Sequence, residues 1–133
     1  MTANGLITIP SSFSVHETID RLAAKAGSLG ITIFARIDHA AGAAQVGMPL
    51  RPTEVLIFGN PRGGTPLMQD NQLAGIDLPL KALAWDDDDG KVSLSYYDAV
   101  WIAEHHGLSS KSAAAIKAIA AGMAAMAKYA TTA

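Results

Sequence analysis

Hydrophobic and polar positions along the chain form short blocks separated by turn residues. Period-two alternation or unbroken apolar runs predict five strands, at residues 5–9, 31–37, 54–58, 78–85 and 91–97. In the last block Val92, Leu94 and Tyr96 alternate with two serines and Tyr97. This alternation predicts a strand with one buried face, and Asp89-Gly90 before it predicts a tight hairpin turn.

Helix signals lie between these blocks. Ser14 followed by Glu17 forms a capping box, and a helix starts there. Its buried stripe is Val15, Ile19, Leu22, Ala23 and Ala26, and Gly27 or Gly30 is expected to end it. Asp38 is expected to cap a short helix over residues 39–46, which Gly47 and Pro49 terminate.

Three further helices are predicted. Thr65-Pro66 is a good cap and first-turn pair for a helix that runs to about Asn71. Asp98 can cap a helix that runs to His106, with Gly107 at its end. Ser109 or Ser110 starts the last helix, an alanine-rich segment over residues 109–133 with the stripe Ile116, Ile119, Met123 and Met126.

The order of these elements predicts one α+β domain over residues 1–133. The economical arrangement is a single, mostly antiparallel sheet of about five strands with helices packed on one face. A chain of 133 residues, half of them hydrophobic, fits one domain with its own core.

Composition narrows the possible partners. The net charge of −2 gives no general electrostatic reason to bind nucleic acid or an anionic membrane. The chain has no cysteine, which excludes disulfides, thiolate nucleophiles and cysteine metal sites. It has no signal peptide and no apolar run of 18 residues, so a cytoplasmic protein is expected.

A glycine-rich loop follows the third predicted strand. The amides of Arg62, Gly63 and Gly64, together with the Thr65 hydroxyl, could hold an anion at the start of a helix. The loop has neither the Gly-Lys-Ser/Thr ending of a P-loop nor a dinucleotide fingerprint. The alternative is a turn in which Asn60 bonds its own backbone.

A second polar group ends the second predicted strand. Arg36, Asp38 and His39 could supply a counter-charge and an acid/base pair, because histidine titrates near neutral pH. The alternative is that Asp38 only caps the next helix and Arg36 pairs with a carboxylate.

The remaining candidates have simpler explanations. His105 and His106 are adjacent on a helix and lack the spacing of two ligands on one helical face, so no metal site is predicted. The aspartate run at residues 86–89 lacks the ligand pattern of a calcium loop and is expected to be a solvated hairpin tip. Nothing in the sequence demands a cofactor.

Four motifs together resemble one family. They are Phe34-x-Arg36-x-Asp38-His39-Ala40, Leu50-x-Pro52-x-x-Val55-Leu56-Ile57-Phe58-Gly59-Asn60-Pro61, Gly64-Thr65-Pro66-Leu67-Met68 and Ile76-Asp77-Leu78-Pro79-Leu80-Lys81. Over about residues 5 to 108 the chain resembles the domain of unknown function 302 family. The resemblance implies a β-α-β(4)-α arrangement of the TATA-binding-protein-like type and a homodimer. It also adds Asp77 to the polar set, without assigning a role.

These observations favour a domain that binds a small polar or anionic ligand through Arg36 and residues 60–65. The first alternative is a hydrolase- or isomerase-like enzyme in which His39 is a general base oriented by Asp38 or Asp77. The second alternative is a dimeric structural or interaction module built on the apolar helix or sheet face.

Overall fold

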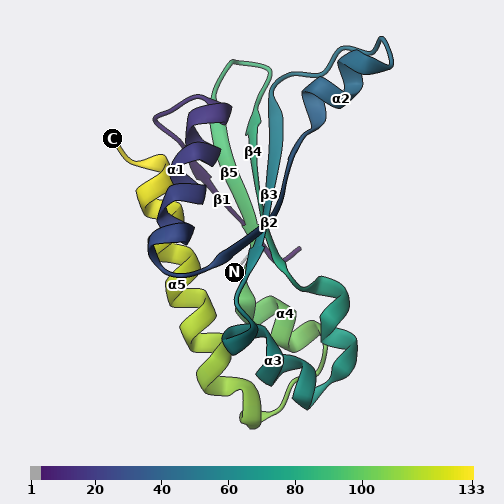
Figure 1. The fold of residues 1–133 in the computed structure, drawn as a ribbon, viewed down its shortest axis with the longest axis vertical. Coiled ribbons are helices and arrows are strands. Elements are labelled where there is room, and N and C mark those ends of the chain that lie inside the picture. Colours follow the sequence, from purple (N-terminus) through teal and green to yellow (C-terminus); the bar gives the residue numbers. More distant parts are fainter. Residues whose placement is uncertain (1–3) are drawn as a thin grey trace.

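The computed structural model describes residues 4–133 and contains one five-stranded antiparallel sheet. The strands are β1 (Leu6–Pro10), β2 (Thr32–Asp38), β3 (Thr53–Gly59), β4 (Leu80–Asp86) and β5 (Val92–Tyr97). Their order across the sheet is β1-β5-β4-β3-β2, so β2 to β5 form a meander and β1 returns to pair with β5 (Figure 1). The α+β class and the five-stranded antiparallel sheet are as predicted.

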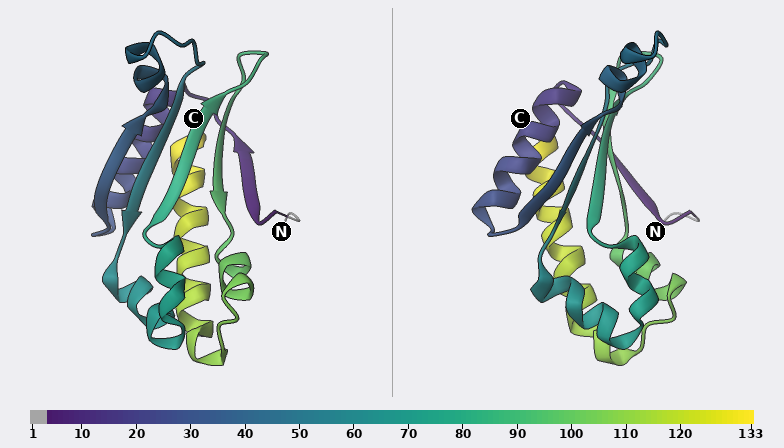
Figure 2. Two further views of the ribbon diagram at one scale, coloured as in Figure 1. Left: turned by 90° about the vertical axis from the view of Figure 1, so that its right-hand side faces the viewer. Right: turned by 45° about the vertical axis from the view of Figure 1, so that its right-hand side comes forward.

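Two helices cover one face of this sheet. They are α1 (Val15–Ser28) and α5 (Ala113–Thr131), which lie side by side behind the strands in Figure 2. Leu22 of α1, Leu56 of β3 and Met126 of α5 are almost fully buried in the core between the helices and the sheet. Within residues 4–133 no helix runs along the opposite face, and Ile37 and Tyr97 on it are each 42% exposed.

Three shorter helices lie beyond the ends of the strands. Helix α2 (His39–Gln45) projects from one end and buries none of its residues. Helices α3 (Pro61–Asp70) and α4 (Ala99–His105) lie at the other end, with the 3-10 turns η1 (Gln72–Asp77) and η2 (Ser110–Ser112). A second, smaller core forms there around Leu67, Ala74, Ala99 and Ile116. The helices on one face of the sheet are therefore α1 and α5 alone.

The caps explain where most helices begin. The Glu17 amide donates to Ser14 Oγ at 3.1 Å, and the Ala41 amide donates to Asp38 Oδ1 at 2.9 Å. Each bond satisfies an amide that the first helical turn leaves without a partner. Asp98 caps α4 in the same way, through the Val100 amide.

The predicted helix start at Thr65-Pro66 is wrong. Helix α3 begins at Pro61, because Asn60 Oδ1 accepts the Arg62 amide at 3.0 Å and proline suits a first helical position. Pro66 lies inside α3. Asn60-Pro61 and Thr65-Pro66 could each begin a helix, and the helix begins at the first pair.

The turn between β4 and β5 also differs from the prediction. Only Gly90 has a positive φ, of 75°, in this turn, and the Asp87 amide donates to the Lys91 carbonyl at 2.9 Å. The Asp87 carboxylate accepts the amides of Asp89 and Lys91, so it closes a wider loop. The tight two-residue turn at Asp89-Gly90 does not form, although the aspartates do lie at a hairpin tip.

Asp70 fastens the end of α3 to η2. Its carboxylate accepts the Ser112 hydroxyl and the Ser109 amide, each at 2.7 Å. These hydrogen bonds stabilise the charged form and lower the pKa of Asp70 below its ordinary value of 3.8. The link connects α3 to the start of α5, and these two helices form the wall of the pocket described next.

Candidate functional site: an apolar pocket

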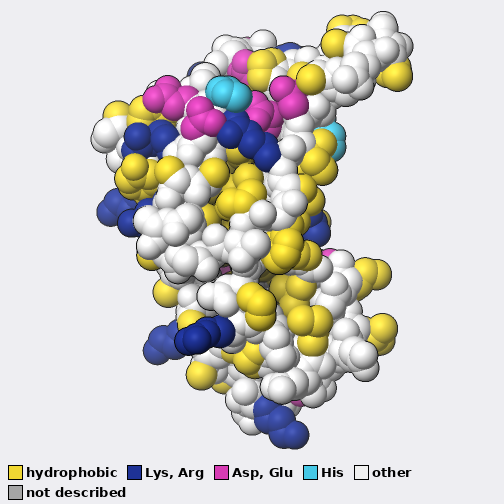
Figure 3. All heavy atoms as spheres, in the orientation of Figure 1, with side chains coloured by type: hydrophobic (Ala, Val, Ile, Leu, Met, Phe, Trp, Pro, Cys, Tyr) yellow, Lys and Arg dark blue, Asp and Glu magenta, His cyan; other side chains and the backbone are white. Residues whose placement is uncertain are grey.

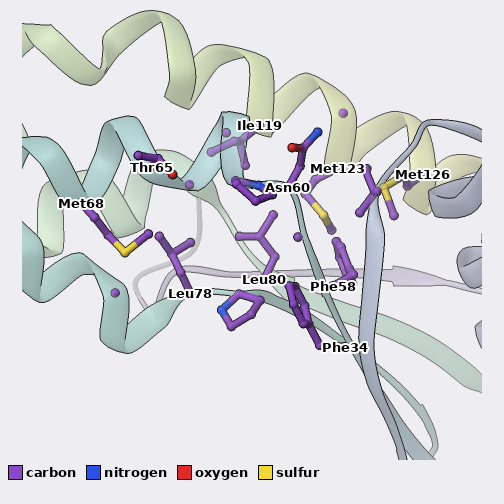
Figure 4. Close-up of a pocket in the computed structure, with 18 residues that line it drawn as sticks. Phe34, Phe58, Asn60, Thr65, Met68, Leu78, Leu80, Ile119, Met123 and Met126 are labelled. Carbon is purple, nitrogen blue, oxygen red and sulfur yellow. The ribbon is translucent and has the colours of Figure 1, made fainter.

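A cavity of about 300 Å³ lies between the end of the sheet, α3, η1 and α5. The strands contribute the rings of Phe34 and Phe58, and α5 contributes Ile119, Met123 and Met126 (Figure 4). The remaining lining residues are Ile31, Gly59, Asn60, Pro61, Gly63, Gly64, Thr65, Met68, Gly75, Leu78, Pro79, Leu80 and Gly122. Among them, only Asn60 and Thr65 have polar side chains.

The glycines that line this cavity differ in the space around them. A Cβ atom on Gly63 would lie 3.6 Å from Ile119 Cγ1, and one on Gly75 would lie 3.1 Å from Met68 Sδ. A larger residue at Gly75 would therefore press on Met68 of α3, whereas one at Gly63 would make an ordinary van der Waals contact with α5. Gly122 differs, because a Cβ atom there would have no heavy atom within 4 Å.

Four of the predicted ligand-binding residues line the cavity, but the amides of the two glycines among them are already used. The amides of Gly63 and Gly64 donate to the Asn60 carbonyl at 2.9 and 3.0 Å, as expected in a first helical turn. Asn60 Oδ1 accepts the Arg62 amide. Arg62 is exposed and does not line the cavity. Residues 61–65 therefore form the start of α3, capped by Asn60, and not a separate turn.

Arg36 lies on the helix-covered face of β2, in an ion-pair cluster with Asp20, Glu54 and His16. Its guanidinium donates to Asp20 Oδ1 at 2.6 Å and to Glu54 Oε1 at 3.0 Å, and lies 3.0 Å from His16 Nδ1. Charged and histidine side chains gather over this region of α1 and the strands (Figure 3). Partial burial alone would lower the pKa of Arg36, but the two carboxylates outweigh it and raise that pKa. Arg36 thus pairs with carboxylates of the protein itself, which was the alternative to its predicted role as a counter-charge for a ligand.

The structure does not bring Asp38 and His39 to the cavity. Asp38 caps α2, and His39 is exposed at the end of the sheet from which α2 projects. Asp77 lies at the opposite end, where its Oδ2 atom is 2.5 Å from His106 Nε2. His39 and Asp77 therefore lie at opposite ends of the sheet. Asp38, the other predicted partner of His39, serves as the cap of α2.

The apolar lining was missed as a site because each part of it has an ordinary explanation in sequence. The sequence places Met123 and Met126 in a packing stripe, and they are indeed 5% and 1% exposed. The Phe34 side chain is 56% exposed, and no sequence pattern indicates that exposure. Gly122, a glycine inside the predicted last helix beside its apolar stripe, is the sequence feature that marks this wall of the cavity.

Comparison with known proteins places the chain in a family. The family described as "Domain of unknown function DUF302" matches residues 7–126. The crystal structure of an uncharacterized conserved DUF302 protein from Bacillus stearothermophilus has a TM-score of 0.84 at 19% identity. That comparison covers 96% of this chain and 99% of the other, and it shows a shared fold.

Two similar sequences are named as channels. "Fluoride-specific ion channel FluC 1" from Brucella suis biovar 1 (strain 1330) is 52% identical over 127 residues, which is 96% of this chain and 50% of that protein. The protein of the same name from Brucella abortus biovar 1 (strain 9-941) is also 52% identical over 127 residues, 47% of its length. The chain thus spans about half the length of these relatives. Within residues 4–133, no helix is long and apolar enough to cross a membrane.

Proposed function

The chain belongs to the DUF302 family, and for it we propose that the cavity between the sheet, α3 and α5 binds a small, largely apolar molecule. One observation carries the proposal: a cavity of about 300 Å³ is lined almost entirely by apolar side chains from separate segments of the chain. Small-molecule sites are typically concave, largely apolar and provided with a few polar groups that orient the ligand. Asn60 and Thr65 are the polar side chains available for that role.

The lining favours some ligand classes over others. No lysine, arginine, aspartate or glutamate is among the described residues that line the cavity. A charged ligand would lose its hydration there without gaining a partner of opposite charge, which is costly. The rings of Phe34 and Phe58 and the thioethers of Met68 and Met123 suit an aromatic or branched aliphatic group, because methionine adapts its shape and contacts aromatic rings favourably. The proposal therefore replaces the polar or anionic ligand of the sequence prediction with an apolar one.

Gly122→Leu tests this directly. The substituted side chain enters open space beside the cavity and removes volume that the ligand would occupy. Replacing a helical glycine by leucine also favours the helix by up to about 1 kcal/mol, so the variant is expected to fold. Gly42→Leu is the matched control, because Gly42 lies within α2, also has no atom within 4 Å of a built Cβ and does not line the cavity.

The assay uses indole and toluene as probes, measured by calorimetry and by saturation-transfer NMR. We expect wild type and Gly42→Leu to bind at least one probe with equal affinity, and Gly122→Leu to bind it at least tenfold more weakly. Circular dichroism checks that both variants keep the wild-type fold. Absence of binding to wild type, or equal binding to a folded Gly122→Leu variant, overturns the proposal.

A further inference from the structure

Three metal-binding side chains meet at the end of α4. Asp77 at the end of η1, His105 at the end of α4 and His106 directly after it each place one donor atom within 4.8 Å of the other two. We propose that these three side chains form a site for a divalent transition metal ion, with Zn²⁺ as the best fit. The site is distinct from the apolar cavity.

The spacing of the histidines along one helix could not reveal this site. Neighbouring helical residues diverge by about 100°, so they do not present one ligating face. Here α4 ends at His105, and His106 has already left the helix, with a φ of −95° and a ψ of 4°. The third ligand, Asp77, comes from 29 residues before His106. The cluster therefore depends on the tertiary packing of η1 against α4.

The surrounding contacts hold two of the three ligands in place. The His106 side chain is only 9% exposed, and its Nε2 atom lies 2.5 Å from Asp77 Oδ2. Asn71 Nδ2 donates to the His106 carbonyl at 2.8 Å, which anchors the backbone at this point. Oriented ligands lower the conformational cost of binding an ion.

An aromatic stack positions the third ligand. The His105 ring stacks on Trp101 at 4.8 Å between centroids, and Trp101 stacks on Tyr97 at 5.1 Å. His105 is exposed, so the cluster is open to ions from solvent. The stack also gives the site an optical reporter, because one of the chain's two tryptophans contacts a proposed ligand.

The ligand chemistry favours zinc among common divalent ions. Two imidazoles and one carboxylate are a frequent set for Zn²⁺, whereas Ca²⁺ and Mg²⁺ prefer oxygen ligands only. Donor atoms that share a tetrahedral zinc lie roughly 3.3 Å apart, given zinc-ligand distances of about 2.0–2.1 Å. The Asp77–His106 pair would open by less than about 1 Å and His105 would move inward, which side-chain rotation can supply. Three protein ligands leave a fourth position for water or another small ligand.

The test is Zn²⁺ binding to the tag-free protein. We expect one Zn²⁺ per chain by calorimetry, a change in the fluorescence of Trp101 at the same stoichiometry, and visible absorption bands of a four-coordinate ion when Co²⁺ replaces Zn²⁺. His105→Ala and Asp77→Asn remove one ligand each, and the asparagine can still hydrogen-bond His106. Each is expected to weaken binding at least tenfold.

His39→Ala is the matched control, because His39 is an exposed histidine at the other end of the sheet. It should bind Zn²⁺ as wild type does. The proposal fails if wild type binds no stoichiometric Zn²⁺, or if folded Asp77→Asn and His105→Ala variants bind it with unchanged affinity. It also fails if His39→Ala lowers the affinity as much as they do.

Discussion

Replacing Arg36 by methionine separates a structural role from a ligand-binding one. Arg36 bridges α1 to the strands through Asp20 and Glu54. Glu54 is 5% exposed, so its carboxylate depends on the guanidinium for compensation in the folded protein. Methionine keeps most of the side-chain volume and removes the charge, which leaves Glu54 buried with a weaker partner.

The expected loss is about 2 kcal/mol in the free energy of unfolding. Removing one partner of a fully buried ion pair costs about 3–5 kcal/mol. Two features reduce that cost here: the Arg36 side chain is 30% exposed, and His16 Nδ1 remains 3.2 Å from Glu54 Oε2. For a chain of this length, 2 kcal/mol lowers the melting temperature by about 8 °C.

Urea unfolding at neutral pH measures this loss, with Arg51→Met as the control. Arg51 pairs with Asp88, but both side chains are mostly exposed, so its replacement should cost less than about 0.5 kcal/mol. A double-mutant cycle with Glu54→Gln should give a coupling energy of about 1 kcal/mol or more. Equal effects of Arg36→Met and Arg51→Met, or a coupling energy near zero, would refute the assignment of Arg36 to the fold.

Two further predictions concern the ends of α3. Asn60→Ala should lower the free energy of unfolding, measured in urea, by about 1 kcal/mol, because it removes the side-chain cap. Asn60→Asp should restore the stability, and unchanged stability in the alanine variant would argue against the cap. The pKa of Asp70 is lowered in the folded protein, so its contribution to stability is complete above pH 3.8 and is lost as the pH falls below that value. Asp70→Asn should therefore flatten the acid side of a plot of melting temperature against pH, and an identical acid slope in wild type would contradict this.

Local signals were enough to predict most of the fold. The caps at Ser14, Asp38 and Asp98 are short side-chain-to-backbone bonds that depend only on neighbouring residues, and all three form. Alternation along β5 is likewise local, and Leu94 and Tyr96 are buried as expected. Element order and class follow from such signals, because each is contained within a few residues.

The errors arose where tertiary packing decides between local choices. Helix α3 includes Gly63 and Gly64, although glycine is a poor helix former, and these two residues face Ile119 of α5 and Leu78. No local pattern predicts η1, which lies against Met68 through Gly75.

No local sequence pattern predicts a site whose residues come from distant segments of the chain. The apolar cavity draws its lining from β2, β3, α3, η1, β4 and α5. The cluster of Asp77, His105 and His106 likewise joins two elements. Asn60 and Thr65 do line the cavity, but no local pattern indicates that the side chains around them are apolar.

The strand order has a consequence for how the chain assembles. Strands β2 to β5 pair with their neighbours in sequence, so this meander can form from local contacts. Strand β1 must instead find β5, where Thr8 and Ser95 pair across 87 residues, and α1 meets α5, where Arg21 donates to the Tyr129 carbonyl across 108 residues. Closing such long loops costs entropy before any contact compensates for it. The first βα unit therefore closes the longest loops of this fold, and β1 has its place in the sheet only once β5, at residues 92–97, is present.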